Sequence, residues 1–170
     1  PVTETATWRH EYYLTVISAH GLPEPTSGWF TAGTEISASV ASQLSGPTGT
    51  RYVCTGWTGK GSVSSTGTAT STAFTINEPS SITWNWKTQY YLTMWTNLGT
   101  VSPGDGWYDE GSIVSISAAP PQTVEGKGYV WHGWAGTCAV SFSGLDNPAD
   151  ITINSPVSEV AHWKILPDLT

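Results

Sequence analysis

The sequence predicts an all-β protein made of two tandem small β-sandwich or β-grasp-like repeats, preceded by one extra closing strand. Two observations predict this fold class. The chain repeats itself at a nearly constant spacing, and apolar residues alternate with Ser and Thr between turns rich in Gly and Pro. Such alternation is typical of strands that bury one face. Because no window combines a helical period with capping residues, no helix is predicted.

The internal repeat defines the domain organisation. Three motifs occur twice, with spacings of 78, 77 and 77 residues. The pairs are SGWFTAG (Ser27–Gly33) with DGWYDEG (Asp105–Gly111), RYVCTGW (Arg51–Trp57) with GYVWHGW (Gly128–Trp134), and FTINEP (Phe74–Pro79) with ITINSP (Ile151–Pro156). A segment of this size, about 77 residues, is large enough to bury its own core. We therefore expect repeat 1 at residues 11–87, repeat 2 at residues 88–164 and a tail at residues 165–170.

Residues 1–10 match only the end of a repeat. PVTETATWRH is similar to PVSEVAHWKI near the other end of the chain, and both place Trp seven positions after Pro. Val2, Glu4, Ala6 and Trp8 alternate with Thr, which predicts the closing strand of a preceding repeat. An unpaired strand is a template for the edge of another sheet. These four residues are therefore the predicted assembly site, acting by strand donation.

The junctions between repeats contain no residue that favours chain reversal. From Ala6 to Val16, and again from Thr83 to Thr93, there is no Gly, Pro or Asp. We expect each closing strand to run directly into the next opening strand, which joins successive repeats head to tail. Turns are predicted at GLPEPTSG, SGPTG, TGKGS, NLG, SPGDG and NPAD, which leaves about five to seven short strands in each repeat.

Composition excludes several classes of partner. Charged residues make up only 11% of the chain, but its aromatic content of 12% supplies enough apolar area for a folded protein. The formal net charge is −7 with six Lys and Arg, so we expect no nucleic-acid partner. No apolar run approaches the roughly 20 residues of a membrane span, so no membrane insertion is expected within this segment.

The ten Trp residues fall into two groups. Those at matched repeat positions are most simply packing residues, and a structural core is predicted from Trp29, Trp57, Trp86, Trp107, Trp134 and Trp163. The other group has smaller residues at the matched positions and is predicted to form a contact surface for a neighbouring subunit or a glycan: Trp84, Trp95 and Trp131. Local repacking is the alternative explanation for this second group.

No catalytic constellation is present in the sequence, so we expect no enzyme activity, no catalytic residue, no metal and no cofactor. The four His lie on separate segments without metal-ligand spacing. Asp105, Asp109 and Glu110 offer oxygen ligands that would suit calcium. The matched loop of repeat 1 lacks these carboxylates, however, and a solvated turn is the simpler interpretation.

The two cysteines do not occupy equivalent positions. Cys54 matches Trp131, and Cys138 matches Gly61, so no disulfide recurs within each repeat. A disulfide between repeats or between subunits would form in an oxidising exterior. Two free thiols are the alternative.

Several motifs together carry a family resemblance. YYLTV, SGWFTAGT or DGWYDEGS, RYVCTGWTG or GYVWHGWAG, and T-I-N-x-P followed by x-W-K occur in this order. This string resembles the small tandem β repeats of archaeal and bacterial cell-surface proteins and is distantly similar to the internalin-type B-repeat family. The resemblance covers essentially the whole chain. It implies an extracellular segment of a stalk, surface layer or filament, and it supplies no catalytic residues.

Two functions are expected from the residues and the resemblance together. The first is a structural repeat segment of an extracellular surface protein, which assembles head to tail with neighbouring copies or repeats as a filament, stalk or surface layer. The second is an adhesive or carbohydrate-binding β module, whose partner would be a glycan or another cell-surface ligand. An adhesin would need its target, whereas a structural subunit would form ordered assemblies without one.

Overall fold

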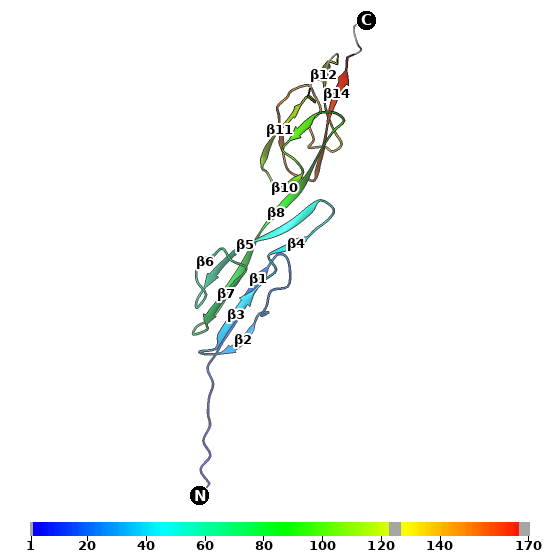
Figure 1. The fold of residues 1–170 in the computed structure, drawn as a ribbon. Helices are drawn as coiled ribbons and strands as arrows, with labels where there is room; N and C mark the ends of the chain where they lie inside the picture. The colour runs from blue at the N-terminus through cyan, green and yellow to red at the C-terminus, as the bar shows by residue number, and fades with distance from the viewer. Residues whose placement is uncertain (1, 123–126, 167–170) are drawn as a thin grey trace. The chain divides into compact units, whose positions relative to one another are not determined.

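The computed structural model describes residues 2–122 and 127–166 (Figure 1), and within these ranges all regular elements are strands and none is a helix. The all-β fold class predicted from the sequence is therefore confirmed. The chain divides into two compact units. Unit 1 comprises Pro1–Leu44 and Tyr52–Lys87, and unit 2 comprises Ser45–Arg51 and Thr88–Thr170.

The first eight strands bring together distant parts of repeat 1. They are β1 (Glu11–Ser18), β2 (Gly28–Thr31), β3 (Glu35–Ser39), β4 (Gln43–Ser45), β5 (Thr50–Lys60), β6 (Thr66–Gly67), β7 (Ser71–Thr75) and β8 (Ser80–Thr96). In unit 1, β1 pairs antiparallel with β2, with Tyr13 opposite Trp29, and parallel with β8, with Leu14 opposite Ser80. β8 also pairs with β5, while β3 and β7 form a separate antiparallel sheet.

Unit 2 repeats this pairing scheme. Its further strands are β9 (Thr100–Ser102), β10 (Gly106–Asp109), β11 (Ile113–Ala119), β12 (Tyr129–Gly136), β13 (Ala149–Thr152) and β14 (Val157–Ile165). The second half of β8 pairs antiparallel with β10 and parallel with β14, β12 pairs antiparallel with β14, and β11 pairs with β13. The strand order β10-β8-β14-β12 thus corresponds to β2-β1-β8-β5 in unit 1.

β8 is the link between the two sequence repeats. It runs from Ser80 to Thr96 as one strand, and the boundary between the two units falls within this strand, between Lys87 and Thr88. The absence of turn residues predicted such a direct run. The units nevertheless differ from the sequence repeats at one place, because Ser45–Arg51 belongs to repeat 1 in sequence but to unit 2 in the structure.

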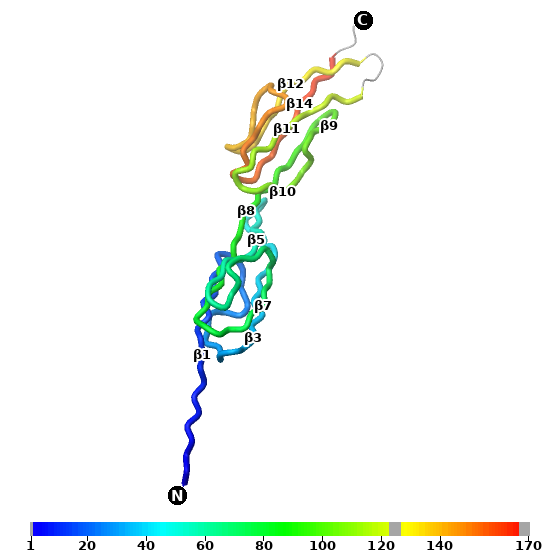
Figure 2. Tube along the Cα trace, turned by 90° about the vertical axis from the view of Figure 1, so that its left-hand side faces the viewer, coloured from blue at the N-terminus to red at the C-terminus, as the bar shows by residue number. Residues whose placement is uncertain are grey.

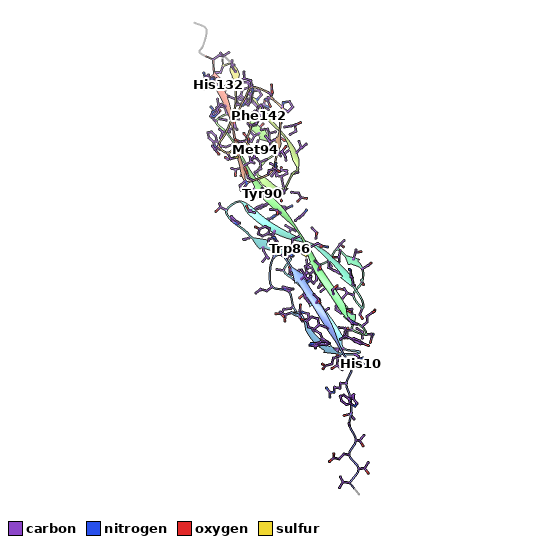
Figure 3. The ribbon with its side chains drawn as sticks, turned by 180° about the vertical axis from the view of Figure 1, so that it is seen from behind. His10, Trp86, Tyr90, Met94, His132 and Phe142 are labelled. Carbon is purple, nitrogen blue, oxygen red and sulfur yellow. The ribbon has the colours of Figure 1, made fainter. Side chains whose placement is uncertain are left out.

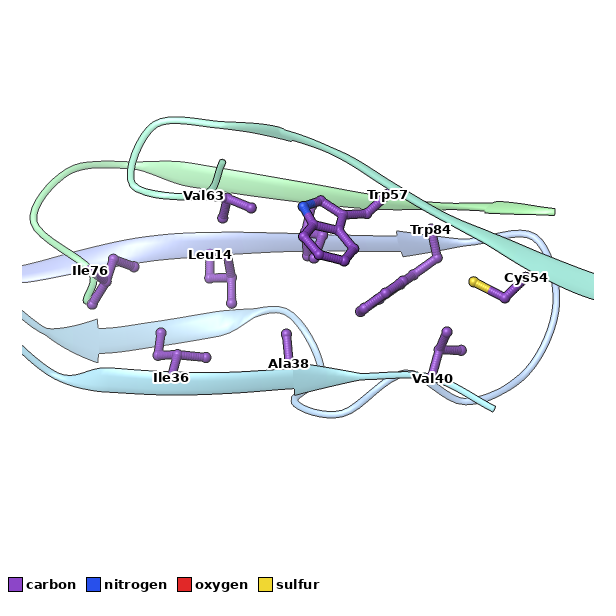
Figure 4. Packing of buried hydrophobic residues seen from close by; sticks show 10 residues of the cluster. Leu14, Ile36, Ala38, Val40, Cys54, Trp57, Val63, Ile76 and Trp84 are labelled. Atoms are coloured by element: carbon purple, nitrogen blue, oxygen red, sulfur yellow. The ribbon is translucent and has the colours of Figure 1, made fainter. Parts of the chain in front are cut away.

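Each unit has its own hydrophobic core. The alternating residues of β1, β3, β5 and β8 point their apolar side chains into unit 1 (Figure 4), where the buried residues are Leu14, Ile36, Ala38, Val40, Cys54, Trp57, Val63, Ile76, Ile82 and Trp84. The buried residues of unit 2 are Leu92, Met94, Val114, Ile116, Trp134, Ala149, Ile151, Ile153, Val157 and Ala161. Burial of these side chains provides most of the driving force for folding.

A glycine in the shared G-W pair allows the following indole to enter each core. Gly56 and Gly133 have φ angles of 116° and 108°, which residues with a side chain rarely adopt. A Cβ atom at Gly56 would lie only 1.9 Å from the carbonyl oxygen of Gly67, on the neighbouring strand β6. The close approach therefore explains why Gly precedes the buried Trp57 and Trp134 in both repeats.

Candidate assembly site

The segment with the predicted donor-strand pattern is exposed. Residues 2–10 form no strand within the described structure, and they extend away from β1 as the dark blue segment in Figure 2. The indole of Trp8 is 93% exposed, and Val2 is similarly open to solvent. The nearest anchoring contact is at His10, whose carbonyl oxygen accepts a hydrogen bond of 2.8 Å from the Ala32 N–H. An apolar, strand-patterned segment is thus left without a sheet.

The same side chains are buried when they occur in β14. Val157, Glu159, Ala161 and Trp163 repeat the residue types of Val2, Glu4, Ala6 and Trp8 in the same order and spacing. All four residues of β14 are buried, with Trp163 only 8% exposed. The closing strand of repeat 1 has different residues at these places, namely Ser80, Ile82, Trp84 and Trp86. The N-terminal segment therefore carries the buried face of a unit 2 strand, rather than that of unit 1.

Glu159 makes this face chemically distinctive. Its side chain is fully buried, and Oε1 accepts a hydrogen bond of 2.7 Å from the backbone N–H of Phe142, which Figure 3 places in unit 2. Oε2 is buried without a hydrogen-bond partner among the described residues. Burial raises the pKa of Glu159 above its ordinary value of 4.5, and the hydrogen bond from Phe142 opposes part of this effect. The matched position in unit 1 is the apolar Ile82.

The matched tryptophans do not all lie in a core. Trp57, Trp134 and Trp163 are buried, and Trp86 packs against the unit 1 core while its Nε1–H donates to Ser18 Oγ. Trp107 is half-buried.

Trp29 differs from the prediction, because it is 66% exposed and lies outside the core. It belongs to the short strand β2, which pairs with β1 alone in the sheet order, so its indole contacts the edge of Tyr13 instead of entering the core.

The unmatched tryptophans include two that pack inside. Trp84 is only 2% exposed and Trp131 is half-buried, so the structure places neither on an open contact surface. Each meets the shared core indole edge-on: Trp84 lies 5.8 Å from Trp57, and Trp131 lies 5.5 Å from Trp134. Trp131 also donates a hydrogen bond to the Leu145 carbonyl oxygen.

In each repeat the space beside the core indole, Trp57 or Trp134, is thus filled by a second Trp, which comes from a different strand in the two repeats. Repeat 1 combines Trp84 with the small Cys54, and repeat 2 combines Trp131 with the small Ala161. Local repacking, the alternative explanation, accounts for both indoles. Trp95 remains on the surface, with 56% of its side chain exposed.

An arginine that the sequence pattern did not single out makes a close contact in unit 2. The guanidinium of Arg51 lies 4.5 Å from the centre of the Trp107 ring, and its Nε donates to Gln89 Oε1 at 2.7 Å. The Tyr91 N–H donates to the Gly49 carbonyl oxygen at 2.9 Å. The repeat comparison gave no signal for Arg51, because Gly128 occupies the matched position.

The acidic loop of repeat 2 uses its carboxylates within the protein. Asp105 Oδ1 accepts a hydrogen bond of 2.7 Å from the Met94 N–H, as Ser27 Oγ does from the Val16 N–H in repeat 1. Asp109 accepts a hydrogen bond from Gln89, and Glu110 accepts one from the Tyr90 hydroxyl. Within residues 2–122 and 127–166, no three His, Cys, Asp or Glu side chains are grouped to hold a metal ion.

The two cysteines are free thiols in this structure. Cys54 is buried in unit 1 and its Sγ lies 3.6 Å from the Gly56 carbonyl oxygen, whereas Cys138 is half-buried in unit 2. Within the described chain, Cys54 and Cys138 are therefore not joined to each other. No helix in the part of the chain that the structure describes is long and apolar enough to cross a membrane.

A comparison with protein families assigns the second repeat. Residues 90–166, which extend from the middle of β8 to the end of β14, match the model of the divergent InlB B-repeat domain. This match confirms the resemblance to internalin-type B-repeats. The searches of curated proteins and of solved structures each gave no match. Residues 90–166 of the chain are therefore similar to the divergent InlB B-repeat domain.

Proposed function

We propose that this chain is a structural repeat segment of an extracellular surface protein, and that its repeats are joined head to tail into a filament, stalk or surface layer. The B-repeat domain supports this role, because the family is typical of cell-surface proteins. The direct run of β8 from one repeat into the next supports a serial arrangement. Such a role requires neither a catalytic centre nor a cofactor, and its partners are neighbouring copies or repeats.

One observation carries the proposal. Residues 2–8 have the side chains of the buried face of β14, but they are exposed and have no sheet partner in the described structure. We propose that this segment completes the sheet of a preceding repeat body, either in the same polypeptide or in a neighbouring subunit. The acceptor must lack or displace its own closing strand, because β14 already fills this place between β8 and β12 in unit 2 of the chain. Strand addition would supply main-chain hydrogen bonds and pockets for alternate side chains. Because the contact is head to tail, a series that does not close into a ring grows as a fibre.

Deletion of residues 1–8 tests the role of this segment. The truncated chain should keep both folded units, because the contacts of Trp8 and its neighbours contribute nothing to either core. It should lose the ability to form ordered assemblies, since the donated strand is absent. Sedimentation velocity and electron microscopy would measure assembly, and far-ultraviolet circular dichroism would check the fold. Normal assembly by the truncated chain would exclude strand donation between subunits.

A pair of point variants provides a sharper test. Ala6 matches Ala161, which is fully buried, whereas Thr7 matches His162, which is bulky and partly exposed. Ala6→Arg should block insertion of the strand and abolish assembly, because an arginine has no space at a buried alanine position. Thr7→Arg adds the same charge one residue further along and should assemble normally. If the two variants assembled to the same extent, insertion of the strand with Ala6 in the place of Ala161 would be contradicted.

The alternative role as an adhesive or carbohydrate-binding module rests on the exposed indole of Trp95. Aromatic faces that are open to solvent suit contacts with sugars. This role predicts a chain that binds a glycan panel in a Trp95-dependent manner and that does not assemble without ligand. The same sedimentation measurements, made with and without glycans, separate the two roles.

A further inference from the structure

A turn that repeat 1 contributes to unit 2 is held in a defined shape. This covering turn, Ser45–Arg51, connects the ends of β4 and β5. Within it, the Gly46 N–H donates to the Thr50 carbonyl oxygen at 3.0 Å, and the Thr50 N–H donates to the Pro47 carbonyl oxygen at 2.8 Å. The closing strand of the same repeat is the first half of β8, which runs directly into unit 2. The preceding repeat therefore supplies part of unit 2.

The covering turn makes three kinds of contact in unit 2. The guanidinium of Arg51 lies 4.5 Å from the centre of the Trp107 ring. The Gly49 carbonyl oxygen accepts a hydrogen bond of 2.9 Å from the Tyr91 N–H. Gly49 also packs so closely on Pro156 that a Cβ atom there would lie 2.8 Å from the proline ring. The turn thus covers an indole, a strand N–H and a proline.

Unit 1 has the same residue types at the three contacted positions. The two aromatic pairs have nearly the same geometry, since their ring centres are 5.3 Å apart at 70° in unit 1 and 5.1 Å apart at 64° in unit 2. In the repeat alignment, Tyr91, Trp107 and Pro156 of unit 2 match, in this order, Tyr13, Trp29 and Pro79 of unit 1. The surface that receives the covering turn is therefore present in both units.

This surface is open in unit 1. Tyr13 is 40% exposed, Trp29 is 66% exposed and Pro79 is also exposed, whereas their three counterparts in unit 2 are half-buried. Within the described residues, no loop carbonyl accepts a hydrogen bond from the Tyr13 N–H. Unit 1 thus presents the contact groups of unit 2 without a covering turn.

The charge at the edge of the open surface indicates the chemistry of its partner. In unit 2, the neutral Gln89 accepts a hydrogen bond of 2.7 Å from Arg51 Nε through its Oε1 atom. The matched residue in unit 1 is the exposed Glu11, which is opposite Thr31 in the β1–β2 pair. A carboxylate beside an open indole favours a guanidinium, which forms charge-assisted hydrogen bonds with the first and a cation–π contact with the second.

The order of segments along the chain indicates where this partner comes from. In unit 2, the covering turn belongs to the repeat whose closing strand runs into the strand of Tyr91. Residues 2–8 have the side-chain pattern of a closing strand and lead in the same way into β1, the strand of Tyr13. The equivalent turn for unit 1 is therefore that of the repeat body that residues 2–8 would close. Because residues 2–8 are themselves the closing strand of this body, no other strand has to be displaced.

We infer that Glu11, Tyr13, Trp29 and Pro79 form a docking surface for an arginine-bearing turn of a repeat that precedes repeat 1 in the same polypeptide. The guanidinium pairs with the Glu11 carboxylate and lies on the Trp29 ring. A glycine carbonyl of the turn accepts the Tyr13 N–H, and this glycine packs on Pro79. The inference rests on the proposed head-to-tail arrangement and names a second contact between successive repeats, in addition to the closing strand.

A cyclic peptide with the sequence of Gln43–Val53 is a probe for this surface, because it contains the whole covering turn. The full chain is labelled with 5-fluorotryptophan and titrated with the peptide, and fluorine NMR follows each indole. Single Trp→Phe variants assign the signals of Trp29, Trp95 and Trp107. The Trp29 signal should shift until it saturates. The signal of Trp107, which its own turn already covers, and that of the exposed Trp95 should stay in place.

Matched variants test the chemistry of the contact. Arg51→Gln in the peptide should weaken binding by about tenfold or more, because it removes the cation that both Glu11 and Trp29 would contact. Glu11→Gln in the chain should weaken binding less, since the amide of Gln89 accepts the same hydrogen bond in unit 2. Trp29→Ala should abolish binding, and fluorescence anisotropy of a dye-labelled peptide measures the affinity for this variant.

Three results would overturn the inference. The first is a Trp29 signal that does not move at about 5 mM peptide, because a turn held by a short tether acts at a concentration of about this order. The second is an equal shift of the Trp29 and Trp95 signals, which would show unspecific contact with exposed indoles. The third is equal affinity of the original and Arg51→Gln peptides.

The chain without residues 1–8 separates this inference from the proposed function. It should bind the peptide as tightly as the full chain, because the docking surface begins at Glu11. Peptide binding without ordered assembly of the full chain supports the docking surface and removes strand donation between subunits. Assembly that depends on residues 1–8, in a chain that does not bind the peptide, leaves strand donation intact and removes the docking surface.

Discussion

At the scale of single residues, Glu159 distinguishes the closing strand of repeat 2 from that of repeat 1. A buried carboxylate loses hydration, and one hydrogen bond from Phe142 replaces only part of it. Glu4 repeats this residue type in the exposed N-terminal segment. The buried carboxylate of Glu159 thus works against the stability of unit 2, and Glu4 makes the N-terminal segment similar to β14 at a position where repeat 1 has the apolar Ile82.

The raised pKa of Glu159 makes the stability of unit 2 depend on pH. The native state binds the proton more tightly than the unfolded state, so this group favours folding below its ordinary pKa of 4.5, and the benefit is lost as the pH rises through the raised value. Glu159→Gln should therefore stabilise unit 2 at about pH 7, and the gain should shrink towards about pH 4. Chemical denaturation followed by Trp fluorescence measures the free energy of unfolding of the variant and of the original chain at each pH.

Glu4→Gln is the matched control for this prediction. It changes the same residue type at an exposed position, so it should leave the pH dependence of unfolding in the isolated chain unchanged. If Glu159→Gln were no more stable than the original chain at neutral pH, burial of the ionised carboxylate would not be a source of instability.

At the scale of elements, each unit packs one additional indole against its core Trp, but the indole comes from a different strand in each unit. In unit 1 the additional indole comes from β8 as Trp84, and β5 provides the small Cys54. In unit 2 it comes from β12 as Trp131, and the closing strand provides the small Ala161. Both arrangements give the shared Trp57 or Trp134 an edge-on aromatic neighbour, which is a favourable geometry for ring pairs.

Transfer of one arrangement into the other unit tests this compensation. Trp84→Ala alone should lower the free energy of unfolding by about 3–5 kcal/mol, because it opens a cavity. Cys54→Trp alone should cost about 1–3 kcal/mol through overpacking. The double variant reproduces the side chains of unit 2 and should be more stable than the sum of the single losses, by about 0.5–3 kcal/mol. Additive losses in urea denaturation would show that the two positions do not share one space.

At the scale of the whole molecule, each unit has its own core and one of two equivalent aromatic pairs, Tyr13–Trp29 in unit 1 and Tyr91–Trp107 in unit 2. The order of the repeats in the sequence nevertheless does not give the residues of each unit. Ser45–Arg51 belongs to unit 2, so one hairpin of repeat 1 contributes residues to both units. The two aromatic pairs consequently differ in exposure, although their residues and geometry match.

Substitution of the shared core indoles tests the separation of the cores. Trp57→Ala and Trp134→Ala should each cost about 3–5 kcal/mol, because each leaves a cavity in a small core. Hydrogen exchange should show the loss mainly in the amides of the substituted unit, since Trp57 and Trp134 belong to separate clusters. Trp95→Ala should have little effect on the melting temperature. Equal destabilisation by all three variants would contradict the distinction between core and surface indoles.

The sequence by itself determined the all-β class, the repeat and the burial of the matched indoles Trp57 and Trp134. Alternation along the chain and recurrence after 77 or 78 residues are local properties that can be read without contacts. They therefore predicted the all-β class and the direct run between repeats. The likeness of residues 2–8 to β14 could also be read in this way.

Only the tertiary structure decided which tryptophans are covered, because burial depends on what lies across from a residue and not on the residue itself. Trp29 and Trp107 occupy the same position on equivalent strands, but only Trp107 lies beneath the guanidinium of Arg51. Trp84 is buried in the core that also contains the small Cys54, and no periodic pattern along one strand reports the size of a side chain on another. Packing between strands distant in sequence therefore decided which indoles remain exposed.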